Sequence, residues 1–177
     1  NAVKFGQLLA NNARKRFGVQ HKIATIKSAE LADDGSIAAL LSADGERLEF
    51  DFYLDCSGFH ALLLGQTMGL KFIDKSAQIR NDRALAIQIP SAENAPLAPY
   101  TLATAHSAGW VWNIPLTNRR GVGFVYSSEF LSEDAAHLGL ARYLQQDPEQ
   151  ITPRKISMRI GYRERFWHKN VVALGLA

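Results

Sequence analysis

The sequence predicts an α/β fold of the mixed α+β kind in a globular chain. Three patterns lead to this prediction: an apolar helical stretch near the start, short strands separated by glycine turns, and an apolar strand that runs into a Ser-Gly turn. Of the 177 residues, 47% are hydrophobic and 21% are charged. This composition is typical of folded domains and unlike that of disordered chains.

The first part of the chain combines a helix with short antiparallel strands. Apolar residues recur at near-helical spacing over residues 2–17, and Gly18 is placed to end that helix in the left-handed conformation. Strands are predicted over Val19–Leu31 and Ile37–Leu41, because turn residues separate apolar runs there. The hairpin turns fall at Asp33-Asp34-Gly35 and Ala43-Asp44-Gly45.

A strand, a tight turn and a helix follow in residues 48–70. Leu48–Leu54 alternates apolar and polar residues, the chain then enters Ser57-Gly58, and Leu62–Leu70 has helical spacing. This order is the geometry of a dinucleotide-binding crossover, in which small residues let the backbone approach a phosphate or a ring. An ordinary strand-to-helix turn explains the same residues.

The remainder of the chain reads as an antiparallel sheet with one helix. Ser132 is placed to cap a helix over Glu133–Leu144, and Asp147-Pro148 is placed to stop it. The predicted strands are Arg83–Ile89, Tyr100–Ala105, Trp110–Leu116, Gly121–Tyr126 and Lys155–Tyr162.

The two ends of the chain predict a fragment of a longer protein. The chain starts at Asn1 rather than at Met, and it stops within the apolar run Val171–Ala177. Such a run is typical of a buried strand. We therefore expect part of the chemistry to lie outside these residues.

Composition argues against several classes of protein. The net charge of +3 is spread along the chain, which is too weak a signal for a nucleic-acid partner. Apolar stretches fall short of the ~20 residues that cross a bilayer, so no membrane partner is expected. Cys56, the lone cysteine, forms no intrachain disulfide and is expected to be a buried, inert thiol in a cytoplasmic protein. The five histidines lack zinc-site spacing, so no metal is expected.

The most unusual local feature is Gly109–Pro115, which holds two of the three tryptophans. On a strand, Trp110, Trp112 and Ile114 share one face at intervals of about 7 Å, which predicts a flat aromatic wall. Such a wall can stack on an aromatic ligand or keep substrate from a reactive centre, and core packing of a sheet is the alternative. Pro115 has no N–H to donate, so the strand is expected to end or reach an edge there.

In this order the segments resemble the flavin-dependent halogenases of the tryptophan halogenase family. The resemblance covers nearly the whole chain, and its most specific part is the Trp-x-Trp-x-Ile-Pro string that begins at Trp110. The other matching residues are Phe17–His21 leading to Ile26, then Asp33, Gly35 and Ile37, Asp55–Phe59 with Leu62–Leu64 after it, Asn81–Ala84, Pro99–Thr101 and Gly123–Phe130.

The resemblance implies an FAD-binding fold of the flavin monooxygenase type with an antiparallel sheet on the substrate side. Residues 1–70 and 154–177 would belong to the FAD-binding domain, and 71–153 to the sheet domain with its helix. The implied enzyme is an oxidoreductase: reduced FAD from a partner flavin reductase, oxygen and a halide ion chlorinate or brominate a small aromatic substrate, tryptophan or another indole, as in antibiotic biosynthesis. A homodimer is left open.

The resemblance also implies roles for particular residues. Trp110 and Trp112 would keep organic substrate away from the oxygen-loaded flavin, and Ile114 and Pro115 would hold that barrier in place. The implied cofactor contacts are Ile26, Ser57, Gly58, Gly175 and Leu176. The family's phosphate loop and catalytic lysine are expected before these residues, and its glutamate and Ser-Thr halide site after them, so the fragment alone is expected to be inactive.

Two other functions are considered beside this one. The first is a flavin monooxygenase that hydroxylates or epoxidises its substrate on the same scaffold, which the paired tryptophans argue against. The second is a non-catalytic domain that binds an aromatic ligand on Trp110 and Trp112.

Overall fold

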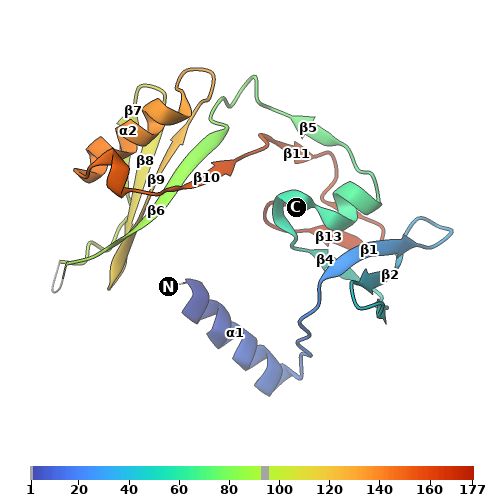
Figure 1. The fold of residues 1–177 in the computed structure, drawn as a ribbon. Coiled ribbons are helices and arrows are strands. Elements are labelled where there is room, and N and C mark those ends of the chain that lie inside the picture. Colours follow the sequence, from blue (N-terminus) through green and yellow to red (C-terminus); the bar gives the residue numbers. More distant parts are fainter. Residues whose placement is uncertain (1, 93–95) are drawn as a thin grey trace. The chain divides into compact units, whose positions relative to one another are not determined.

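A computed structural model describes residues 2–92 and 96–177, and these form two compact units. The first unit contains the chain up to Ile73 together with Arg163–Ala177, and the second contains Asp74–Tyr162 (Figure 1). The predicted division at residues 70 and 153 concerns the domains of the longer protein and stays a prediction.

The first unit begins with the predicted helix and an antiparallel meander. Helix α1 (Ala2–Phe17) ends at Gly18, which has a φ of 65°, as predicted. Strands β1 (Ile26–Leu31), β2 (Ile37–Ser42) and β3 (Arg47–Leu48) follow in the order β1-β2-β3. The prediction that β1 starts at residue 19 is wrong: Ile26 already pairs with the last residue of β2, so the earlier residues have no strand beside them.

Helix α1 follows the local pattern although it contributes no buried side chain among the described residues. None of the residues that the structure describes in α1 is buried, and its large apolar side chains are exposed. The helical spacing therefore predicts the conformation of this segment without saying what covers it.

The second half of the first unit is a sheet with the order β12-β13-β4. Strand β4 (Tyr53–Asp55) is followed by the 3₁₀ turn η1 (Gly58–His60) and the π-helix η2 (Leu62–Thr67). Strand β13 (Val171–Ala173) pairs with β4 in parallel, and β12 (Trp167–His168) pairs with β13 in the antiparallel sense. Figure 1 shows β13 beside β4.

This arrangement shortens two predicted strands. Residues 48–54 do not form one strand, because Leu48 ends a strand that pairs with β2 and Tyr53 begins one that pairs with β13. The terminal apolar run leaves the sheet after Ala173. The core of this unit consists of Ile37, Tyr53, Leu63, Leu64, Val171 and Ala173.

The second unit is an antiparallel sheet with the order β10-β6-β9-β8-β7. Figure 1 shows α2 (Glu133–Leu144) lying over one face of it. The strands are β6 (Arg83–Pro90), β7 (Leu102–His106), β8 (Gly109–Pro115), β9 (Arg119–Tyr126) and β10 (Arg154–Ser157). Leu85, Phe124, Tyr126 and Leu140 are among the buried side chains between sheet and helix.

The ends of α2 are set by local side chains. Ser132 Oγ accepts a hydrogen bond from the Ala135 N–H at 3.2 Å, which confirms the predicted cap. The helix ends at Leu144, before the predicted stop, because Gln145 adopts the left-handed conformation. Asp147 instead caps the 3₁₀ turn η3 (Pro148–Gln150).

The strand predicted over Lys155–Tyr162 is two strands. Residues 154–157 form β10 and pair with β6, whereas β11 (Gly161–Arg163) pairs with β5 (Phe72–Asp74) in another sheet. A change of pairing partner explains the interruption. In the described part of the chain, no helix is long and apolar enough to cross a bilayer.

Candidate functional site

Strand β8 presents Trp110, Trp112 and Ile114 on the sheet face that α2 does not cover. The alternate residues turn to the helix: Val111 is buried in the core, and Asn113 Nδ2 donates a hydrogen bond to Tyr143 Oη at 3.4 Å. Tyr143 belongs to α2. The predicted alternation along this strand is therefore confirmed.

The two indoles form a tilted pair. Their ring centroids lie 6.0 Å apart and their planes meet at 57°, so the prediction of a flat wall is wrong. Trp110 is 39% exposed and Trp112 is half-buried, because nothing in the second unit covers this face of the described sheet. Within the described part of the second unit, core packing does not account for the pair.

Strand β8 ends at Pro115, as the missing N–H predicts. Pro115 pairs with Arg120 on β9, and the chain then turns, with the Leu116 N–H donating to the Arg119 carbonyl oxygen at 2.7 Å. On its other side, β8 pairs with β7 only from Gly109 to Asn113. Pro115 thus lies beyond the ladder in which its N–H would be needed.

Four of the predicted cofactor contacts lie at one edge of the sheet in the first unit, the edge at which β4 and β13 have their carboxyl ends. Because β4 and β13 are parallel, Ser57 and Gly58 leave the same edge of the sheet as Gly175 and Leu176. The Leu174 N–H donates to the Asp55 carbonyl oxygen at 2.9 Å, which joins the two segments at that edge. Ligands of α/β proteins bind beyond the carboxyl ends of parallel strands. Ile26 is not at this edge: it is the first residue of β1, in the meander.

Asp55 organises this edge, a role that the strand-turn-helix pattern does not predict. Asp55 is buried, with an exposed fraction of 3%. One oxygen accepts hydrogen bonds from Ser57 N and Oγ at 3.1 and 2.6 Å, and the other accepts from the N–H groups of Leu63 and Leu64 at 2.8 and 3.2 Å. The same Asp-x-Ser turn occurs at Asp34 and Asp74 and is the signal that could have identified it.

The charge of Asp55 decides what this edge can bind. Burial would raise the pKa of the Asp55 carboxyl, but the hydrogen bonds from Ser57, Leu63 and Leu64 outweigh burial and hold that pKa below its usual range. The carboxylate is ionised at neutral pH and occupies amides at the start of η2. A phosphate at this turn would meet a negative charge and find those donors taken, so of the two expected ligands the uncharged ring is favoured here.

Cys56 is exposed rather than buried. The side chain of Asp55 points into the protein, and on a strand the next side chain points the other way. Within residues 2–92 and 96–177, no group of three His, Cys, Asp or Glu side chains is placed to hold a metal ion.

The family model of the tryptophan halogenases matches residues 1–177. The chain belongs to the tryptophan halogenase family. It spans about a third of the length of the curated relatives that it matches. One of these is tryptophan 7-halogenase KtzQ of Kutzneria sp. (strain 744), which is 38% identical over 170 residues, or 96% of this chain and 32% of the relative.

Solved structures of halogenases share the fold of this chain. The tryptophan halogenase of Shewanella frigidimarina NCIMB 400 superposes with a TM-score of 0.93 at 35% identity, covering 99% of this chain and 34% of its own. BrvH, a flavin-dependent halogenase from Brevundimonas sp. BAL3, superposes with a TM-score of 0.89 at 42% identity, covering 97% of this chain and 35% of its own. The mixed fold predicted from the sequence is therefore confirmed.

Beyond Asp55, the edge at the carboxyl ends of β4 and β13 presents bare backbone and an apolar side chain. Gly58 and Gly175 have φ values of 64° and 72°, and a Cβ at either position would meet no described atom within 4 Å. Leu176 beside them is 63% exposed. Bare backbone and an apolar side chain can contact a ring or a sugar closely.

Proposed function

We propose that the full-length protein is an FAD-dependent halogenase that uses reduced flavin, oxygen and chloride or bromide to halogenate tryptophan or another indole. The observation that carries this proposal is the pair of indoles, Trp110 and Trp112, on a sheet face that α2 leaves open. Membership of the tryptophan halogenase family supports it.

The indole pair acts by size. Two neighbouring rings with centroids 6.0 Å apart obstruct a molecule as large as an indole or phenol, whereas a halide ion is smaller than either ring. An organic substrate is thereby kept from the reactive flavin while the anion reaches it. Ile114 and Pro115 hold the strand that carries the pair. A flavin monooxygenase needs no such separation, because its organic substrate must reach the flavin.

The residues at the β4 and β13 edge hold the cofactor. Gly58 and Gly175 contact the uncharged part of FAD through their backbone, and Ser57 and Leu176 flank it. Ile26 contacts the cofactor from β1. Bound reduced FAD supplies, with oxygen, the oxidising power that the halide requires. Asp55 keeps the turn in shape and excludes a phosphate from it.

We further propose that a flavin reductase supplies the reduced FAD and that the protein works in the cytoplasm. The aromatic substrate and the halide ion are its other small-molecule partners. A homodimer is compatible with these assignments and is tested by the mass of the protein in solution.

The proposal is tested with the full-length protein, a flavin reductase, FAD, a halide and a panel of indoles, phenols and pyrroles. We expect a product with the isotope pattern of one chlorine or bromine atom, formed from an indole and absent when halide is omitted. A control without reductase should give no product. A product that contains added oxygen whether or not halide is present would support a monooxygenase instead. A protein that does not bind FAD on titration would support the aromatic-binding domain.

A further inference from the structure

Gly123 lies directly beneath the Trp112 indole. The two residues pair across β9 and β8. A Cβ atom built on Gly123 would lie 2.0 Å from Cζ2, 2.2 Å from Cη2 and 2.5 Å from Cε2 of Trp112. These three atoms belong to the six-membered ring of the indole. That ring therefore rests on the glycine backbone, at a separation that leaves no room for a methyl group.

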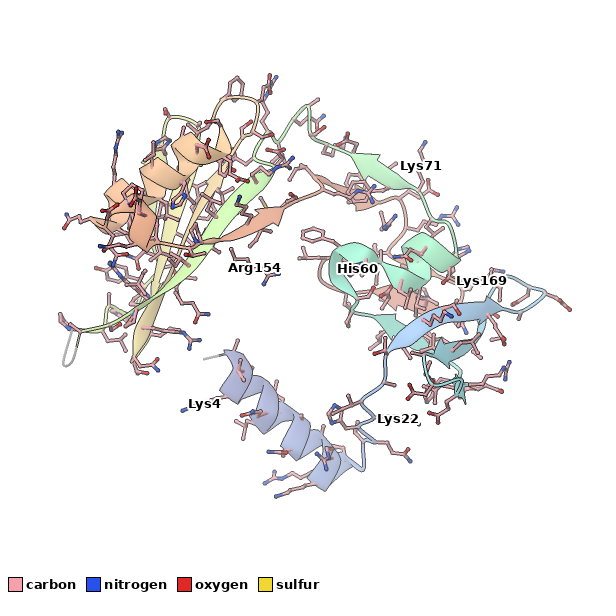
Figure 2. All side chains as sticks on the ribbon, viewed as in Figure 1. Lys4, Lys22, His60, Lys71, Arg154 and Lys169 are labelled. Atoms are coloured by element: carbon pink, nitrogen blue, oxygen red, sulfur yellow. The ribbon has the colours of Figure 1, made fainter. Side chains whose placement is uncertain are left out.

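The residues around Trp112 on this face are small. Across the sheet, Trp112 pairs with Ala103 on β7 and Gly123 on β9, and Gly123 pairs in turn with Ala86 on β6. The row continues to Arg154 on β10, whose side chain Figure 2 shows on the side of the sheet away from α2. The indole can extend across β9 because its direct cross-strand neighbours, Ala103 and Gly123, leave the space above the sheet open.

Trp110 is held in a different way. It pairs with Val125, which has a branched side chain, so no comparable glycine lies beneath it. Its ring contacts the ring of Trp112, at a centroid distance of 6.0 Å. A shift of the Trp112 ring therefore changes the angle between the two rings.

Strand β8, which carries Trp112, cannot move away from a side chain at position 123 of β9. On the opposite face Val111 is packed in the core under α2, and Asn113 is hydrogen-bonded to Tyr143. At the start of β8, a Cβ on Gly109 would lie 1.9 Å from the Val125 carbonyl oxygen, so the two strands are in close contact there as well. A methyl group on residue 123 would therefore displace the indole rather than the backbone.

We propose that Gly123 is a positioning residue: its backbone supports the Trp112 indole, a contact that we call the seat, and so sets the tilt of the tryptophan pair. This inference rests on the proposed function for its effect on catalysis, because the pair separates halide from organic substrate. The seat itself is a property of the sheet. A side chain at residue 123 lifts the ring of Trp112, changes the angle to Trp110 and opens the barrier.

Gly123→Ala in the full-length protein tests the seat, with Gly121→Ala as the matched control. Gly121 lies on the same strand and the same face, opposite Ile114, and a Cβ there would meet no described atom within 4 Å. Two indoles whose centroids lie 6.0 Å apart give an exciton-coupled circular dichroism signal that depends on the angle between their ring planes. We expect G123A to change this signal and G121A to leave it as in the wild type.

Activity and rescue complete the experiment. We expect G123A to lower the halogenated product formed per flavin oxidised by about tenfold or more, the size of effect that a misplaced group produces, and G121A to change it less than twofold. We also expect G123A to lower the thermal midpoint of unfolding, because the added methyl group clashes with the indole. Trp112→Phe removes the outer indole atoms, so the W112F/G123A double variant should regain that loss. G123A should add nothing to the activity loss of Trp112→Ala.

The two proposals fail in different ways. An unchanged dichroism signal in G123A, or an equal change in G121A, would overturn the seat whatever the activity. A changed signal in G123A alone supports the seat, even if no variant and no wild-type protein halogenates. An absence of halogenation by the wild-type protein would contradict only the proposed function.

Discussion

Replacement of both Trp110 and Trp112 by alanine is expected to lower halogenation by the full-length protein about 100-fold, because organic substrate then reaches the reactive flavin and consumes its oxidising power before a halide does. The fold should survive, because both side chains lie on the sheet face away from α2 and outside the buried core. The measurement is halogenated product per flavin oxidised, with reduced flavin supplied in excess.

The third tryptophan provides the control for this experiment. Trp167 belongs to the other unit, is 61% exposed, and donates its indole N–H to the Lys169 carbonyl oxygen at 3.0 Å. Trp167→Ala should change halogenation less than twofold, since it removes an indole without touching the pair. Halogenation at the wild-type rate by the W110A/W112A variant would show that the pair is not a barrier.

Asp55→Asn is expected to lower the free energy of unfolding by about 2–3 kcal/mol, the cost of buried donors that lose a charged acceptor. Asparagine keeps one acceptor oxygen and replaces the other with an NH₂ group. That NH₂ group, itself a hydrogen-bond donor, would face the donors that the lost oxygen had accepted from. Either Ser57 or the N–H groups of Leu63 and Leu64 then lose their partner. Chemical denaturation of the full-length protein at pH 7 measures the change.

The same residue predicts a dependence of stability on pH. The pKa of Asp55 is lower in the folded chain than the ordinary 3.8, so the unfolded chain binds more protons in that range. The stabilisation by Asp55 is complete above the ordinary pKa and is lost as the pH falls through the lower, folded value. D55N should lack this part of the acid dependence.

Asp34→Asn is the matched control. Asp34 forms the same turn, accepting hydrogen bonds from Ser36 N at 2.9 Å and from Ser36 Oγ at 2.6 Å, but it is exposed and accepts no helix amide. Its replacement should leave the denaturation midpoint near that of the wild type. Equal midpoints for D55N and D34N would mean that the amides of η2 do not depend on the carboxylate.

The features predicted well from the sequence are those set by neighbouring residues. The helix over residues 2–17 with its glycine end, the Ser132 cap and the two faces of β8 follow from side-chain periods and from hydrogen bonds within a few residues. The Trp-x-Trp-x-Ile-Pro string also predicted the family, which the comparison over residues 1–177 confirms.

The errors occur where a distant segment supplies the partner. The strand predicted from residue 19 begins at Ile26, because β2 ends opposite that residue. Residues 155–162 belong to two sheets, since β6 and β5 pair with different parts of this stretch. Cys56 was expected to be buried and is exposed, because Asp55 takes the inward position beside β13.

The sequence by itself determined helices α1 and α2, the alternation of Trp110 with Val111 and the family. Only the tertiary structure decided that β13 lies parallel to β4, that the Asp55 carboxylate receives the amides of η2, and that Gly123 lies under Trp112. The physical reason is the range of the interactions. Periodicity and caps act over one or two turns of chain, whereas strand pairing and the space above a glycine depend on residues that meet only when the chain has folded.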